Sequence, residues 1–405
     1  GRTTPHTAPG GMEMDGRATT WPSVSGGGLE QTQTTMLMEM SSDGSDSDFD
    51  PEHEEEMIQV ENRIMAEDVY GFALTSLIRD SRMLASAHGD SCLRISRLIA
   101  SQLFCLAHIF TLAWLLMETQ RLVTSKHIQD TRELYDKYEF HMYGSMESHT
   151  ELTVHGNHRG LAGFFQPELF DTLDPAIMDE ICVISLSCPN FFMVILSIWT
   201  LTCLGEVQAC GSMAWSVFAL PTISTMKHAL IGLPKYDFAY KLKNKLPPRL
   251  QERVEALGPN DRLVIGLTMR CKLYVLLCIA LPRFCMTVYL LWLGCRWLLA
   301  TSGFENVLLN GVALEFILVL KNLLYTTVVP LRNKKDVQCT QMIPAKGSLT
   351  ERASYMTMLG SFGWYLLAIG WAYAYTFYLQ GVIPGYRWDV SGPCEKYVAR
   401  HFTMI

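Results

Sequence analysis

Four polar residues stand within stretches of sequence that are otherwise apolar, and their side chains are the ones most able to do chemistry in such surroundings. They are Arg283, Glu315, Lys321 and Asn322. The first lies in the apolar run 273–295, and the other three lie in the run 307–330. A charged group at the centre of a bilayer costs about 2.5–3.5 kcal/mol on insertion scales, so it usually faces protein or water. We therefore predict that these four residues are the functional candidates of the chain.

Arg283 and Glu315 are placed at depths that allow contact. If 273–295 and 307–330 form a helical hairpin, the two residues lie roughly 18 and 12 Å from its turn, at about 1.5 Å per residue. A long arginine side chain can bridge that difference. Two interpretations are open: the polar residues line a path for ions or polar solutes, or they form an ion-pair network that only fixes the packing of the helices.

The run 307–330 also has a polar face. At about 100° per residue, Gly311, Glu315, Asn322 and Thr326 fall within about 60° of one another on a helix. Such a face is expected to contact the interior of a helix bundle, a polar cavity or a partner helix.

The histidines, cysteines and aspartates show no spacing typical of a metal or catalytic site. Histidines gather in the segment 118–180, where a pH response is the alternative to ordinary exposure, but no zinc-ligand spacing occurs. Asp46, Asp48 and Asp50 alternate like the first ligands of a calcium loop, yet Pro51 stands where that loop needs glycine. Most of the 12 cysteines fall in apolar runs, so we deduce no disulfide framework. We predict no metal, no cofactor and no catalytic residue.

Signatures of several protein classes are absent from the sequence. It contains no phosphate-binding glycine loop, no zinc-protease or nucleophile-elbow motif, no ladder of arginines and no potassium-channel filter. An enzyme is therefore the least supported class, and we expect no nucleic-acid partner.

The charge of the chain is unevenly distributed. The net charge is -7, but residues 1–60 contain twelve acidic and two basic residues, so residues 61–405 contain 28 acidic and 31 basic ones. The first 60 residues are also poor in apolar side chains, and such a composition cannot bury enough surface to offset the entropy of ordering. We predict a disordered acidic leader, and we expect a fragment because the sequence begins at Gly1.

The rest of the chain contains five apolar runs that are long enough to cross a bilayer, which takes about 20 residues. These predicted spans are 98–117, 181–204, 273–295, 307–330 and 355–380.

The charges of the loops orient these spans. Loop 118–180 has twelve acidic and five basic residues, loop 224–272 has ten basic and four acidic, and loop 331–353 has five basic and two acidic. Because Lys and Arg accumulate on the cytoplasmic side, we predict that the N-terminus and both basic loops are cytoplasmic. Loop 118–180 and the C-terminus are then extracytoplasmic. A sixth span at 207–223 would move the most basic loop outside, so we expect that segment to be re-entrant or interfacial.

The predicted fold is an all-α helical integral membrane bundle with five spans, or six if 207–223 crosses. Its divisions are a leader at 1–60, a cytoplasmic juxtamembrane segment at 61–97, a transmembrane domain at 98–383 and a short C-terminal tail at 384–405.

One stretch of the chain resembles a known group of proteins. Residues 293–301, LGCRWLLAT, with Phe304 and then residues 310–318, NGVALEFIL, are similar to a segment of uncharacterised multi-pass membrane proteins of algal protists. The resemblance covers about a tenth of the chain. It implies that the hairpin with Glu315 is the shared core, and it implies no activity.

These observations leave two functions open. The first is a channel- or transporter-like conduit for ions or small polar solutes. The second is a non-catalytic membrane scaffold or sensor that presents the cytoplasmic tail and the basic loop 224–272 to partners or anionic lipid. The expected partners are the lipid bilayer and either further copies of this chain or partner membrane helices.

Overall fold

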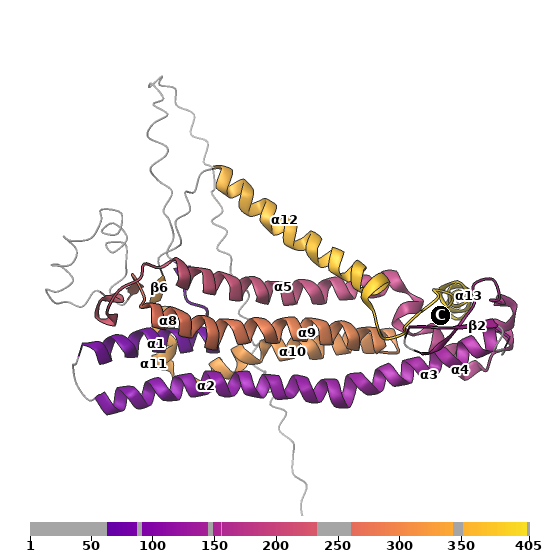
Figure 1. Ribbon diagram of the computed structural model, residues 1–405, viewed down its shortest axis with the longest axis horizontal. Coiled ribbons are helices and arrows are strands. Elements are labelled where there is room, and N and C mark those ends of the chain that lie inside the picture. The colour runs from indigo at the N-terminus through magenta and orange to yellow at the C-terminus, as the bar shows by residue number, and fades with distance from the viewer. Residues whose placement is uncertain are drawn as a thin grey trace, which may run out of the picture. The chain divides into compact units, whose positions relative to one another are not determined.

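The computed structural model of the chain is mostly helical. It describes residues 63–86, 91–144, 149–154, 156–232, 261–342 and 351–402. The predicted acidic leader at 1–60 lies outside the described residues. In Figure 1 the long helices α2, α5, α9 and α10 run side by side, with strand β6 and helix α11 at one end of them and helices α4 and α13 at the other, while α12 runs at an angle to them.

Four helices in the described part of the chain are long and apolar enough to cross a membrane, by length and composition. They are Ser91–Met142, Pro189–Ala219, Met269–Ala300 and Phe304–Val328.

Two of these long helices consist of several labelled elements. The first comprises α2 (Ser91–Glu118), the π turn η2 (Thr119–Thr124) and α3 (Ser125–Met142), and the third comprises α8 (Met269–Tyr274), the π turn η7 (Val275–Ala280) and α9 (Leu281–Ala300). The other two are α5 (Pro189–Ala219) and α10 (Phe304–Val328). Ser91–Met142 has 52 residues, about 78 Å at 1.5 Å per residue, so only part of it fits the roughly 30 Å of a bilayer core. The charged α3 therefore extends beyond any span.

The fifth predicted span, 355–380, is helical but is not among the four. It folds as α12 (Glu351–Ala374) followed by the π turn η8 (Tyr375–Leu379). Its Gly, Ser, Trp and Tyr residues lower its mean hydropathy. The fully buried Ala368 and Ala372 lie one turn apart in α12, which packs against α5, as small residues permit between apolar helices.

Segment 207–223 does not form an element separate from the second predicted span, and the helix of that span has other bounds than 181–204. Residues 207–219 continue α5, which begins only at Pro189 because proline fits the first helical turn. Ile181 and Cys182 instead end the short helix α4 (Pro175–Cys182), which is followed by the 3-10 turn η5 (Ser185–Ser187). No residue between Pro189 and Ala219 stops the helix, so one long element replaces a span and a re-entrant piece.

The predicted juxtamembrane segment contains a largely buried helix, α1 (Val69–Ala85), that packs against α2. Its N-cap is Asp68, whose carboxylate accepts a hydrogen bond from the Gly71 backbone N–H at 2.7 Å. Asp68 itself has an extended backbone, and its cap marks the residue after which the helix begins.

A four-stranded sheet at the end near α11 corrects the all-α prediction. Its order is β1 (Arg63–Ile64), β6 (Thr340–Met342), β5 (Arg262–Val264) and β4 (Leu230–Gly232). Strands β5 and β6 are parallel, with Leu263 opposite Gln341, and the other pairs are antiparallel. Helix α11 (Leu331–Gln338) and the 3-10 turn η6 (Met226–His228) complete this region, which we call the sheet end. Strands of two or three residues leave no periodic pattern in a sequence.

The opposite end is closed by a disulfide between Cys182 in α4 and Cys394 in α13 (Ser391–Phe402), 212 residues apart. The hairpin of β2 (Thr150–Leu152) and β3 (His158–Gly160) and the 3-10 turn η4 (Pro167–Thr172) also belong to this region, which we call the disulfide end. The expectation of no disulfide was therefore wrong. Cys182 was predicted to lie in the span 181–204. Because α5 begins only at Pro189, Cys182 instead lies in α4, outside that helix.

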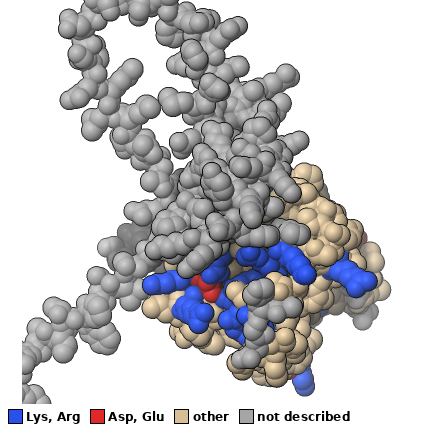
Figure 2. Space-filling model, turned by 90° about the vertical axis from the view of Figure 1, so that its left-hand side faces the viewer, with Lys and Arg blue, Asp and Glu red and all other residues tan. Residues whose placement is uncertain are grey.

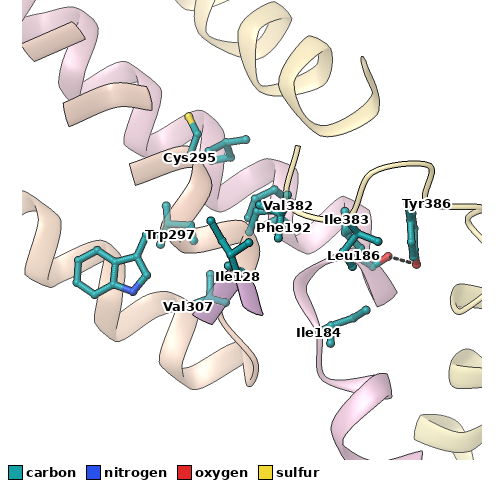
Figure 3. Packing of buried hydrophobic residues seen from close by; sticks show 14 of the residues in the cluster. Ile128, Ile184, Leu186, Phe192, Cys295, Trp297, Val307, Val382, Ile383 and Tyr386 are labelled. Carbon is teal, nitrogen blue, oxygen red and sulfur yellow. Dashed lines mark hydrogen bonds between the residues drawn. The ribbon is translucent and has the colours of Figure 1, made fainter. Parts of the chain in front are cut away.

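The apolar core near the disulfide end joins segments from across the chain (Figure 3). Val382, which follows η8, lies beside Phe192 of α5, and Ile383 lies near Leu186, whose carbonyl accepts a hydrogen bond from the Tyr386 hydroxyl at 3.5 Å. Between α5 and α9 the helices touch at Gly294, where an added Cβ would stand 2.4 Å from the Trp199 indole nitrogen. That contact requires glycine.

Candidate functional site

Arg283 is held in the interior of the bundle by the first turn of α9. Only 4% of the residue is exposed. Pro282 has no backbone N–H to donate to the preceding turn, and the π turn η7 lies directly before α9. Arg283 thus follows directly on a proline and a π turn at the start of α9.

Two carboxylates and a second cation surround Arg283, and together these four form what we call the buried charge cluster. Arg283 Nη2 lies 3.1 Å from Glu206 Oε2 and 3.5 Å from Asp68 Oδ2. Lys321 Nζ contacts the same Glu206 oxygen. The Tyr70 ring covers the guanidinium, with Arg283 Cζ 4.6 Å from its centroid. The cluster is charge-balanced.

The buried charge cluster connects four separate elements. Asp68 precedes α1, Glu206 is in α5, Arg283 is in α9 and Lys321 is in α10. Removing one partner from a buried ion pair strongly destabilises a protein because the remaining charge is left uncompensated. The arrangement is therefore suited to fixing the relative positions of these elements. For Arg283 and Lys321 it agrees with the hypothesis of an ion-pair network that fixes helix packing.

A buried histidine lies next to the cluster. His108 of α2 is 4% exposed, and its ring centroid is 5.6 Å from that of Tyr70. Its Nδ1 has no hydrogen-bond partner among the described residues. The cluster thus has a polar neighbour that the sequence did not single out.

Glu315 and Asn322 are not part of this cluster, and the expected contact between Arg283 and Glu315 does not form. The buried face of α10 consists of Val307, Leu314, Ile317 and Tyr325. Glu315 and Asn322 are exposed, roughly 80–100° around the helix from the centre of that buried face. Lys321 is about 100° from Asn322 on the helix, and it therefore reaches inward to Glu206.

The exposed face of α10 carries Glu315 without a charged partner among the described residues. Neighbours on the same face are apolar: Leu308 is 49% exposed, Val312 64% and Val319 44%. We call this surface the α10 face; it consists of Leu308, Val312, Glu315, Val319, Asn322 and Thr326. Its residues are spaced alternately by four and three, the spacing of a seam between packed helices.

Asp68 and Glu206 are the members of the cluster that sequence reasoning missed. Glu206 was placed just beyond the second predicted span, and Asp68 was placed in a juxtamembrane segment. The sequence could have indicated them, because two buried cations, Arg283 and Lys321, require carboxylates at a similar depth in the helix bundle. With Glu315 turned outward, Glu206 is the acid that meets both cations.

A second ion-pair network lies at the sheet end. Asp80, which is fully buried, accepts hydrogen bonds from Arg79 Nε at 3.0 Å and from Arg97. Asp336 of α11 pairs with Arg79 and, at 3.0 Å, with Arg262 of β5. In Figure 2 the charged residues visible at this end are mostly Lys and Arg.

The disulfide end contains a buried acidic site built from tyrosines. The Asp389 carboxylate accepts hydrogen bonds from the Tyr135 hydroxyl at 3.0 Å and from the Tyr143 hydroxyl at 2.9 Å. Burial raises the pKa of Asp389 above its usual range, although these hydrogen bonds oppose the shift. Trp388, directly before it, has a φ of 60°, which is strained for a residue other than glycine.

Glu139 and Arg159 form a second buried pair at the same end. Arg159 Nη1 lies 3.3 Å from Glu139 Oε2, and Glu139 Oε1 accepts a hydrogen bond from the Gly160 N–H at 3.2 Å. Burial raises the pKa of Glu139 to about 7, more than Arg159 lowers it. This carboxyl titrates near neutrality.

The histidines of segment 118–180 that the structure describes have separate surroundings. His141 Nε2 lies 3.0 Å from the Thr172 hydroxyl, His149 stacks on Phe164, and His158 Nδ1 lies 3.2 Å from the Thr150 hydroxyl. His155 lies outside the described residues. Among the described residues no group of three or more His, Cys, Asp or Glu side chains could hold a metal ion.

The described part of the chain is thus mostly helical and has four helices apolar enough to cross a membrane. No family model, no curated protein and no solved structure matches the chain.

Proposed function

We propose that this protein is a multi-pass integral membrane protein that conducts cations or small polar solutes, and that several copies assemble so that the α10 face lines the path. The long apolar helices support membrane insertion. The two ends support one orientation: disulfides form in oxidising compartments, and Lys and Arg accumulate on the cytoplasmic side. The disulfide end is then extracytoplasmic and the sheet end cytoplasmic.

The exposed Glu315 carries the proposal. A carboxylate on the outside of an apolar helix is costly in lipid, so it requires a polar environment that a single copy does not provide among its described residues. The buried charge cluster cannot supply it, because its cations already meet Asp68 and Glu206. If several copies packed with their α10 faces together, the Glu315 and Asn322 side chains of the copies would face one another. Rings of carboxylates favour cations.

A second candidate is the non-catalytic scaffold or sensor. The observation that favours it is that Arg283 and Lys321, two of the four candidate residues, belong to a neutral network suited to packing. In that case the α10 face binds a partner helix, and no continuous polar path exists.

Cation flux through purified protein in liposomes tests the conduit. We expect Glu315→Gln to lower cation flux by about tenfold or more and to weaken cation selectivity, because it removes a ring of charge. Glu168→Gln is the matched control: it makes the same chemical change at an exposed position of η4, on a different element from α10. Counting subunits by photobleaching should show more than one copy in each active particle.

Two results would overturn the proposal. One is the absence of flux under every gradient of cations and small polar solutes from protein that is folded and oligomeric. The other is equal flux in Glu315→Gln and wild type. A monomer that binds a partner helix through Glu315 would instead support the scaffold.

A further inference from the structure

We infer that an open cavity at the sheet end, between α11 and β5, is a binding site for a multiply phosphorylated head group of a membrane lipid. The cavity has a volume of about 570 Å³ and is lined by Arg262, Leu331, Arg332, Lys335, Asp336 and Cys339. This volume is within the range of small-molecule sites, roughly 300–1,000 Å³. The inference goes beyond conduction and does not depend on it.

The cations of the cavity come from one face of α11 and from the neighbouring strand. Arg332, Lys335, Asp336 and Cys339 are spaced by three, one and three residues, so they share a face of the helix and its end. Strand β5 adds Arg262, whose backbone N–H donates to the Cys339 carbonyl at 2.7 Å. This hydrogen bond sets the distance between strand and helix.

The carboxylate of the cavity is already used within the protein. The two oxygens of Asp336 are bound by Arg79 and Arg262. Arg332 and Lys335 are exposed, and neither has an acidic partner among the described residues. Three cations therefore face one carboxylate that is saturated, and the surplus positive charge suits a ligand with several negative charges. Arginine binds phosphate in a bidentate geometry, and lysine adds a point charge.

The position of the cavity favours a lipid over a soluble phosphate. Helix α11 begins at Leu331, three residues after α10 ends at Val328. If α10 spans the membrane as proposed, Arg332 lies at the level of the head groups. Leu331 is 70% exposed at the edge of the cavity, where an acyl chain or glycerol backbone would cover it. Basic pockets beside transmembrane helices bind such head groups.

The experiment measures binding of the full chain, in nanodiscs of phosphatidylcholine, to fluorescent phosphatidylinositol bisphosphate and to fluorescent phosphatidylserine. The test variant is Arg332→Gln/Lys335→Gln. The matched control is Lys227→Gln/Arg270→Gln, which removes the same charge from exposed residues of the sheet end outside the cavity.

We expect wild type to prefer the bisphosphate lipid and the test variant to lose that preference by about 30-fold, because each of the two basic residues contributes about fivefold. The control should keep the preference. Equal loss in both variants, or no loss in the test variant, would overturn the site, because binding would then follow the general charge of the surface. Equal unfolding temperatures of the two variants confirm that neither disturbs the fold.

Competition by soluble inositol trisphosphate decides between the two sources of the phosphate group. Displacement that needs at least tenfold more of the soluble compound than of the lipid supports the lipid. Equal potency would overturn the assignment to a lipid. Failure of conduction would leave all of these binding results unchanged, because the nanodisc assay requires no flux.

Discussion

Arg283 Nη2 and Glu206 Oε2 lie 3.1 Å apart although 77 residues separate them in the chain. Their pairing joins α9 to α5 in the interior of the bundle, and Lys321 joins α10 to the same carboxylate. The contact also explains why Arg283 does not pair with Glu315. The carboxylate nearest to Arg283 is that of Glu206 in α5, the helix that we had predicted as two segments, 181–204 and 207–223.

The buried charge cluster should respond to mutations as a neutral unit. We expect Arg283→Gln to destabilise the protein by about 3–5 kcal/mol, because Asp68 is left without its cation. Adding Asp68→Asn should recover much of that loss, since Glu206 keeps Lys321 as its partner. Thermal unfolding in detergent measures both variants.

The control for this cycle is Arg283→Gln combined with Glu315→Gln. Glu315 lies on the exposed α10 face, so the second change should recover nothing. Recovery by Glu315→Gln and none by Asp68→Asn would show that the cluster is assigned to the wrong residues.

The disulfide should be a substantial part of the stability of its end of the molecule. We expect Cys394→Ser to lower the free energy of unfolding by about 2–5 kcal/mol, because the bond closes a long loop of the unfolded chain. Cys188→Ser, which changes an exposed free thiol nearby, should have little effect. Thiol labelling of the denatured protein should rise by two groups on reduction; no rise would disprove the bond.

The buried carboxyl of Glu139 should make stability depend on pH. Its folded pKa of about 7 exceeds the ordinary value of 4.5, so the folded state retains a proton that the unfolded state has lost. Stability should therefore fall as pH rises from about 4.5 to about 7, by up to about 3 kcal/mol. The raised pKa of Asp389 acts in the same direction.

Unfolding temperatures measured across this pH range check the slope. Glu139→Gln should flatten it, because an amide does not titrate. Glu133→Gln, the same change at an exposed position of α3, should leave the slope as in wild type. A slope of the opposite sign, or one that Glu139→Gln does not change, would contradict the prediction.

Lys272 should hold the end of α5 in place. Its ammonium is buried and donates hydrogen bonds to the Phe218 carbonyl at 3.1 Å and to the Leu220 carbonyl. Carbonyls at a helix C-terminus have no partner within the helix. We expect Lys272→Met to cost about 1.5–3 kcal/mol and to speed amide exchange near Ala219. Arg270→Met, at an exposed neighbouring position, should do neither.

The part of the fold that the sequence predicted rests on local composition. The apolar runs around 98–117, 273–295 and 307–330 are helical because a long apolar segment satisfies its backbone hydrogen bonds within itself most readily as a helix. The bounds at 181–204 were wrong because Pro189 begins α5, whereas Ile181 and Cys182 belong to the separate helix α4. The small sheet was missed because Arg63 and Met342 meet only after the intervening helices have packed.

The sequence by itself determined which segments are long apolar helices and where charge accumulates, since both are properties of neighbouring residues in one chain. Only the tertiary structure decided which face of α10 is buried, which acids meet Arg283 and which cysteines pair. Each of these depends on segments far apart in the chain. Burial of Val307, Leu314 and Tyr325 rotates α10 so that Lys321 reaches Glu206 while Glu315 remains outside. The sequence predicted the polar face of α10. Whether that face turns toward the bundle or away from it was decided by the packing of the apolar residues of the helix.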